Sequence, residues 1–139
     1  MFRVRNQIEC TDELVNTCGN AGVTIAMLDT GIANHPDFED RIVGFKDFVN
    51  GKGQSYDDSG HGTHVAGCLC GSGRLSDGKY KGIAPSSYLV VGKVLDYKGD
   101  GMIENMVSGI DWILRERKEY NIRILNISIG MGEVADSEK

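Results

Sequence analysis

Apolar residues gather in short continuous runs along this chain instead of alternating strictly with polar ones. Two such runs, at residues 23–28 and 88–95, are typical of strands buried on both faces, as in a parallel sheet. Residues 41–49 mix apolar and charged side chains and predict a more exposed strand. Residues 122–129 predict a fourth strand, which a glycine closes.

Helical periodicity is clearest in the segment that begins near Met102 and ends near residue 118. Apolar side chains recur there at i, i+3, i+4, i+7, i+10 and i+11 counted from Ile103, which makes a wide apolar stripe. The basic residues of the last turn suit the negative end of the helix dipole. A second, shorter helix of small, buried residues is predicted from His61 to about Cys70.

The order strand, helix, strand, helix, strand predicts an α/β protein with a parallel sheet and right-handed crossovers. Residues 1–20 are polar and predict an irregular or partly helical lead-in to a domain at 21–139. In such sheets the chemistry lies beyond the carboxyl ends of the strands. Asp29 and the segment Ser128–Gly130 both fall at such an end.

Composition narrows the class of protein. The chain has 139 residues, of which 40% are hydrophobic and 25% charged, enough apolar material for one globular domain. The net charge is −5 with no basic run, so no nucleic-acid partner is expected. No long apolar stretch occurs, so no membrane-spanning segment is expected either. The 19 glycines predict tight turns and close backbone approaches, as at an active site.

Cysteine usage and the N-terminus bear on the compartment. No two of the four cysteines form a C-x-x-C pair, which disfavours a zinc ribbon or a thioredoxin-type redox site. The residues after Met1 lack the apolar stretch of a signal peptide. These features favour free thiols and a cytoplasmic location, with secretion as the alternative.

Two short motifs carry candidate chemistry. Asp29 ends the first buried strand, where neighbouring backbone amides can hold a desolvated carboxylate still; the alternative is an aspartate that only caps the following turn. Residues 59–67 read S-G-H-G-T-H-V-A-G and place His61 at the start of a glycine-lined helix. An imidazole so placed can shuttle protons near neutral pH, although a lone buried histidine is more often a structural residue.

Together the two motifs resemble those of the subtilisin-like serine peptidases. The resemblance extends in the family's order through His35-Pro36-Asp37, Gly82-Ile83-Ala84-Pro85 and the L-N-I-S-I-G segment at 125–130, and covers roughly residues 20–132. It implies a subtilisin-like parallel sheet with flanking helices and hydrolysis of peptide bonds by an Asp-His-Ser triad. Asp29 would then orient the imidazole, and His61 would be the general base.

The resemblance also implies where a polypeptide substrate lies. Gly99-Asp100-Gly101 and Ser128-Ile129-Gly130 resemble the two backbone segments between which an extended substrate is held as an added strand. Without the resemblance, the first segment would be interpreted as an ordinary turn before the helix. No cofactor is implied for the chemistry. Asp37 matches a position that can contribute to structural calcium, whereas the loop at 71–82 does not match the family's usual calcium loop.

The family's nucleophile is absent from these 139 residues. Neither its G-T-S-like motif nor the oxyanion asparagine occurs in the sequence. The resemblance therefore implies the N-terminal portion of a catalytic domain, inactive alone. Residues 122–129 would then expose an apolar sheet edge that pairs with the C-terminal part of the domain or with a second copy.

Two alternatives remain at this stage. The chain could be a peptide-binding homologue or fragment without chemistry. Alternatively, Asp29-Thr30-Gly31 could belong to a dimeric aspartic peptidase, although those proteins are almost wholly β and this chain predicts a clear helix. A dinucleotide-binding module is disfavoured because no G-x-G-x-x-G follows the first strand.

Overall fold

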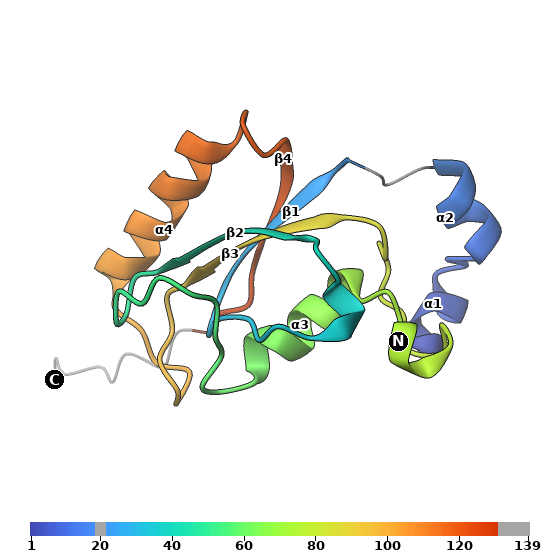
Figure 1. Ribbon diagram of the computed structural model, residues 1–139, viewed down its shortest axis with the longest axis horizontal. Coiled ribbons are helices and arrows are strands. Elements are labelled where there is room, and N and C mark those ends of the chain that lie inside the picture. Colours follow the sequence, from blue (N-terminus) through green and yellow to red (C-terminus); the bar gives the residue numbers. More distant parts are fainter. Residues whose placement is uncertain (19–21, 131–139) are drawn as a thin grey trace, which may run out of the picture.

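A parallel four-stranded sheet forms the centre of the computed structural model, which describes residues 1–18 and 22–130 (Figure 1). The strands lie in the order β2-β3-β1-β4, and every neighbouring pair is parallel. Their bounds are Thr24–Asp29 for β1, Ile42–Asp47 for β2, Tyr88–Lys93 for β3 and Ile122–Ile127 for β4. All six residues of β1 are buried, as its continuous apolar run predicts.

Helices α3 (His61–Cys70) and α4 (Ile103–Glu116) pack on opposite faces of the sheet (Figure 1). Alternate side chains of β1 point to opposite faces, so Ile25 and Met27 join the core beneath α3. Ala26 and Leu28 join the other core, where α4 contributes its Trp112. The sheet is therefore covered on both sides, as an α/β protein requires.

The N-terminal lead-in is more regular than its sequence indicated. It forms two short helices, α1 (Phe2–Gln7) and α2 (Asp12–Cys18). The buried guanidinium of Arg5 donates to the carbonyl of Gly82 and to the Asp12 carboxylate, which also pairs with Lys81 at 2.5 Å. Hydrogen bonds and ion pairs thus attach these helices to the loop that follows α3. Two 3₁₀ turns complete the regular structure, η1 (Pro36–Phe38) and η2 (Arg74–Ser76).

The predicted α/β class and the order of its elements are confirmed. The fourth strand ends at Ile127, two residues earlier than the sequence indicated, because Ser128 and Ile129 leave the ladder with β1. Within the described residues β4 forms one edge of the sheet, and it exposes Ile124 and Ile127. No helix among the residues that the structure describes is long and apolar enough to cross a membrane.

Candidate active site

A buried carboxylate and a half-exposed imidazole meet at the carboxyl edge of the sheet. Asp29 is the last residue of β1 and is fully buried. Its Oδ1 lies 2.7 Å from Nδ1 of His61, and the same oxygen accepts a hydrogen bond from the backbone N–H of Thr30 at 2.7 Å. The carboxylate is therefore held by its own strand end while it faces the histidine.

His61 is the first residue of α3, and its side chain is 53% exposed. The contact with Asp29 occupies Nδ1, so Nε2 is the ring nitrogen that remains for a second partner. A carboxylate on Nδ1 fixes the imidazole tautomer that carries a proton on Nδ1 and leaves Nε2 free to accept one. The pair can therefore act as an oriented general base.

The second oxygen of the carboxylate is also buried. Oδ2 of Asp29 has no hydrogen-bond partner among the described residues. A buried carboxylate whose charge is only partly compensated favours a positive charge nearby. The geometry thus places carboxylate charge beside the ring of His61.

Two glycines allow the end of β1 to approach the start of α3 and the loop before it at backbone distance. A Cβ on Gly62 would lie 2.2 Å from the carbonyl oxygen of Gly31. Gly31 has a φ of 125°, and a Cβ there would lie 2.1 Å from the carbonyl oxygen of Tyr56. A side chain at Gly62 would push the start of α3 away from the end of β1, and one at Gly31 would push the loop at Tyr56 and Asp57 away from it, which explains the glycines in both motifs.

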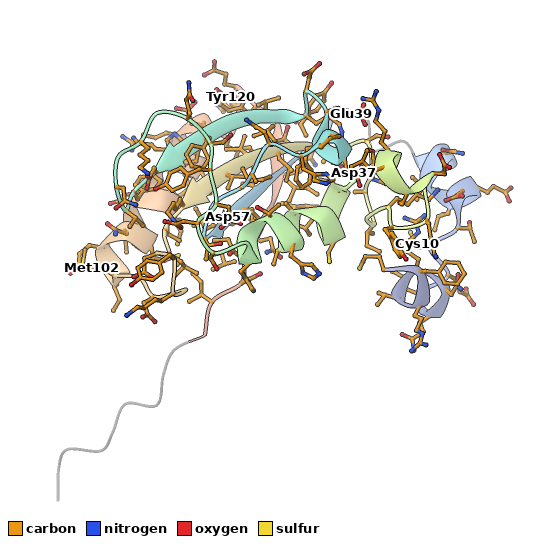
Figure 2. The ribbon with its side chains drawn as sticks, turned by 60° about the horizontal axis from the view of Figure 1, so that its bottom comes forward. Cys10, Asp37, Glu39, Asp57, Met102 and Tyr120 are labelled. Carbon is orange, nitrogen blue, oxygen red and sulfur yellow. The ribbon has the colours of Figure 1, made fainter. Side chains whose placement is uncertain are left out.

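Two threonine hydroxyls and the carboxylate of Asp57 connect the end of β1 with the start of α3. Thr30 Oγ1 donates to Asp57 Oδ1 at 2.9 Å and accepts from the backbone N–H of Gly62 at 2.9 Å. Thr63 Oγ1 donates to Asp57 Oδ2 at 2.6 Å and accepts from the backbone N–H of Ala33 at 3.0 Å. Asp57 lies in the loop that leads into α3 (Figure 2). It therefore holds the aspartate and histidine segments together.

Asp57 has a strongly perturbed pKa. Burial by itself raises the pKa of this carboxyl, but hydrogen bonds from Thr63, Gly60 and Thr30 outweigh the effect of burial and lower the pKa to about 2. Asp57 is therefore a carboxylate throughout the neutral range, and its acceptor capacity is used inside the protein.

The predicted substrate-binding segments lie at one apolar pocket. The pocket has a volume of about 610 Å³ and is lined by Val94, Leu95, Gly99, Asp100, Gly101, Met102, Ile103, Met106, Ile127, Ile129 and Gly130. Five of the six predicted residues are in this set. The exception is Ser128, whose hydroxyl accepts a hydrogen bond from the Asn126 side chain at 2.9 Å. The carbonyl of Asp29 accepts hydrogen bonds from the N–H groups of Val94 and Leu95, which connects the pocket to the Asp–His pair.

Asp37 lies in η1, away from any cluster of metal-ligating side chains. Its Oδ1 accepts a hydrogen bond from the backbone N–H of Leu75 at 2.9 Å. The described residues hold no group of three or more His, Cys, Asp or Glu side chains that could bind a metal ion. Structural calcium at Asp37 stays an untested prediction.

Sequence reasoning missed the residues that support the pair. Thr30, Asp57 and Thr63 lie inside or next to the two motifs, but their sequence positions do not show that their side chains meet. Lys93 falls within the apolar run at 88–95, and a single lysine in a run otherwise buried on both faces is a signal of a polar role. Among the cysteines that the structure describes, Cys10, Cys68 and Cys70 are free thiols, as predicted.

The fold and the site together define a class. This is a parallel α/β protein that pairs a buried aspartate with a helix-borne histidine at the carboxyl edge of its sheet. Comparison with known proteins gives the family: the Subtilase family model matches residues 20–139, and the chain belongs to that family.

Relatives agree with this assignment. Serine protease AprX of Bacillus subtilis (strain 168) is 44% identical over 117 residues, which make up 82% of this chain and 26% of that protein. Subtilisin Savinase of Lederbergia lenta is 38% identical over 110 residues, or 79% of this chain and 38% of that protein. The chain thus spans about a quarter of the length of AprX.

Solved structures show the same fold. A cold-adapted subtilisin-like serine proteinase superposes with a TM-score of 0.61 at 39% identity, over 69% of this chain and 33% of that one. The CspB protease of Clostridium perfringens gives a TM-score of 0.71 at 26% identity, over 84% of this chain and 30% of that one. The alternative of a dimeric aspartic peptidase is wrong, because the fold is α/β and the family is that of the subtilases.

Proposed function

We propose that these residues form the acid–base half of the active site of a subtilisin-like serine endopeptidase. The observation that carries the proposal is the 2.7 Å contact between Asp29 and Nδ1 of a half-exposed His61. The names of the relatives support peptide-bond hydrolysis as the reaction class, since AprX is named a serine protease and Savinase a subtilisin.

In this proposal the two residues divide the proton chemistry. Nε2 of His61 takes the proton of a serine hydroxyl as that oxygen attacks the peptide carbonyl, and later gives the proton to the leaving amine. Asp29 keeps the ring in the required tautomer and stabilises the imidazolium that forms between these steps. The unpaired, buried Oδ2 of Asp29 supports the second role, since it leaves negative charge beside the ring.

The nucleophile is proposed to come from polypeptide outside these 139 residues. Ser59 lies in the loop before α3, where its backbone N–H donates to Asp57, and Ser128 bonds to Asn126. Neither serine hydroxyl is bonded to His61. We therefore expect the chain by itself to be inactive and the complete domain to supply both the serine and the oxyanion donor.

The substrate is proposed to be an extended polypeptide held beside Gly99–Gly101 and Ser128–Gly130. Main-chain hydrogen bonds would provide most of the affinity, and the pocket would select a side chain. Apart from Asp100, its lining is apolar or glycine, which favours an apolar substrate side chain.

A second candidate function is peptide binding without hydrolysis. The observation that favours it is that both predicted substrate-binding segments lie at one pocket, whereas the hydroxyls of Ser59 and Ser128 are not bonded to His61. In this case Asp29 and His61 would have only a structural role. Turnover by the full-length gene product distinguishes the two functions.

The partner is proposed to be the remaining part of the same domain, with self-association as the alternative. The support is the exposed edge strand β4, where Ile124 and Ile127 are 53% and 43% exposed. A cytoplasmic location, with secretion as the alternative, remains a prediction that the structure does not test.

The experiment that tests the proposed function compares two histidines on one helix. His61→Gln and His64→Gln are made in the full-length gene product, and hydrolysis of casein is followed. Since His64 lies one turn further along α3 without a carboxylate partner in the described residues, its variant is expected to stay within tenfold of wild type. His61→Gln is expected to lose about 10⁴-fold or more. Equal activity in the two variants would contradict the proposal.

A further inference from the structure

The last residue of β3 is a lysine whose side chain is fully buried. Lys93 is 0% exposed, and its ammonium donates hydrogen bonds to three oxygens: the carbonyl of Thr30 at 2.6 Å, the carboxylate of Asp58 at 2.7 Å and the carbonyl of Leu95 at 2.8 Å. A lysine ammonium has three donors, so its whole hydrogen-bonding capacity is used. The ring of Tyr56 lies 5.3 Å away and adds a cation–π contact.

The three acceptors belong to the three segments that make up the candidate active site. Thr30 directly follows Asp29. Asp58 lies in the loop three residues before His61. Leu95 lines the apolar pocket and begins the segment that leads to Gly99. One cation thus connects the aspartate, the histidine and the substrate-binding segment, which are far apart in the sequence.

Packing alone gives no reason for a charge at this position. The neighbouring residues of β3 are Leu89, Val90, Val91 and Gly92, all of them buried. An apolar side chain would fill the same space without the cost of removing an ammonium from water. An apolar side chain makes no directional contacts, whereas the three short, charge-assisted hydrogen bonds of an ammonium hold three oxygens at set distances.

We propose that Lys93 is a positioning residue, which sets the distance of Asp29 from His61 and aligns that pair with the substrate-binding segment. The inference rests on the proposed function, which it deepens by adding a residue that acts through the pair without touching the substrate. Small displacements of reacting groups are enough to cost a large part of the rate.

The test uses the full-length gene product with Lys93→Met and, as a matched control, Val91→Ala from the same buried strand. Two readouts are taken well below the unfolding temperature: kcat and KM on a peptide substrate, and the downfield proton resonance of the short bond between Nδ1 of His61 and Asp29. That resonance is assigned by its loss in His61→Gln and does not depend on turnover.

For Lys93→Met we expect kcat to fall about 10- to 100-fold, KM to change less than threefold and the resonance to shift or broaden. Val91→Ala is expected to be less stable but to keep the wild-type kcat and resonance. Lys93→Arg, which keeps a cation with several donors, is expected to recover part of kcat. The inference is overturned if Lys93→Met behaves like Val91→Ala in both readouts, or if only its KM changes.

A second variant serves if Lys93→Met fails to fold. Asp58 is 37% exposed, so Asp58→Asn can be made without leaving a buried cavity. This variant weakens only the bond that reaches the histidine loop, and kcat is expected to fall about 3- to 10-fold with a shifted resonance. An unchanged kcat and resonance would overturn the inference. If the wild-type protein shows no turnover, the proposed function fails, while the resonance still decides the role of Lys93.

Discussion

All polar groups of Thr30 are hydrogen-bonded, and its hydroxyl and carbonyl connect the end of β1 to the other segments of the candidate site. Its N–H donates to Asp29, its hydroxyl bonds to both Asp57 and Gly62, and its carbonyl accepts from Lys93. Apart from Asp29, none of these partners belongs to the proposed acid–base pair. The position of the Asp29–His61 pair therefore depends on residues with ordinary side chains and fully used hydrogen bonds.

The close approach at Gly62 leads to the first prediction. Gly62→Ala places a methyl group against the carbonyl oxygen of Gly31, so the start of α3 must move away from the end of β1. We expect the free energy of unfolding to fall by about 1–3 kcal/mol and kcat to fall at least tenfold. Urea unfolding and peptide hydrolysis by the full-length gene product measure the two effects.

The control for this variant lies on the same helix. A Cβ on Gly67 would meet no atom within 4 Å, and alanine favours a helix over glycine. Gly67→Ala is expected to leave kcat unchanged and to keep or raise stability by less than about 1 kcal/mol. A similar loss in both variants would show that the contact at Gly62 is not responsible.

The lowered pKa of Asp57 predicts how stability depends on pH. The folded pKa of about 2 lies below the ordinary value of 3.8, so this carboxylate stabilises the fold above pH 3.8. That contribution is lost as the pH falls from 3.8 through about 2. Asp57→Asn is expected to be less stable at pH 7 by about 1–3 kcal/mol and to depend less on pH below 4.

Urea unfolding between pH 2 and 7 measures this dependence. Asp77→Asn is a suitable control. Asp77 is exposed in the turn that follows η2, and it makes no ion pair among the described residues. It is expected to match the wild type at every pH. Equal pH dependence in Asp57→Asn and wild type would rule out the role given to Asp57.

At the scale of elements, the sequence predicted most of the fold because burial leaves a clear pattern. A strand covered on both faces is apolar throughout, as β1 and β3 are, and α4 carries a regular apolar stripe. The two motifs likewise identified Asp29 and His61, since each lies within two residues of a glycine that permits close approach.

Other features could not be predicted from the sequence because they depend on contacts between residues that are distant along the chain. The order β2-β3-β1-β4 is set by pairing between strands, and no short stretch of sequence encodes it. Lys93 bonds to residues 63 and 35 positions away in the sequence, so its role is visible only once the strands are assembled. The supporting bonds of Asp57 became visible in the same way.

The edge strand β4 gives a prediction at this scale. Its exposed apolar residues and unpaired edge invite another strand to add to the sheet. We expect the 139-residue chain to self-associate at tens of micromolar and Ile124→Lys to reduce this association. Light scattering distinguishes the outcomes. A monodisperse monomer with the wild-type sequence would contradict the proposed partner surface.

At the scale of the whole molecule, the described residues concentrate their chemistry at one edge of the sheet. The Asp–His pair and the apolar pocket are joined through the carbonyl of Asp29, and Lys93 links both to the loop before α3. Subtilases whose names identify them as proteases extend well beyond the part matched here. The central claim is therefore that this part orients a proton acceptor and needs a serine from elsewhere in the protein.

Fluorophosphonate labelling read by intact mass tests that claim most directly. The 139-residue chain and the full-length gene product are treated in parallel, with His61→Gln in the longer protein as the control. The account predicts one adduct on the full-length protein, a greatly slowed reaction in His61→Gln and no adduct on the 139-residue chain. An adduct on the 139-residue chain would contradict the account, because one of its own serines would then be the nucleophile.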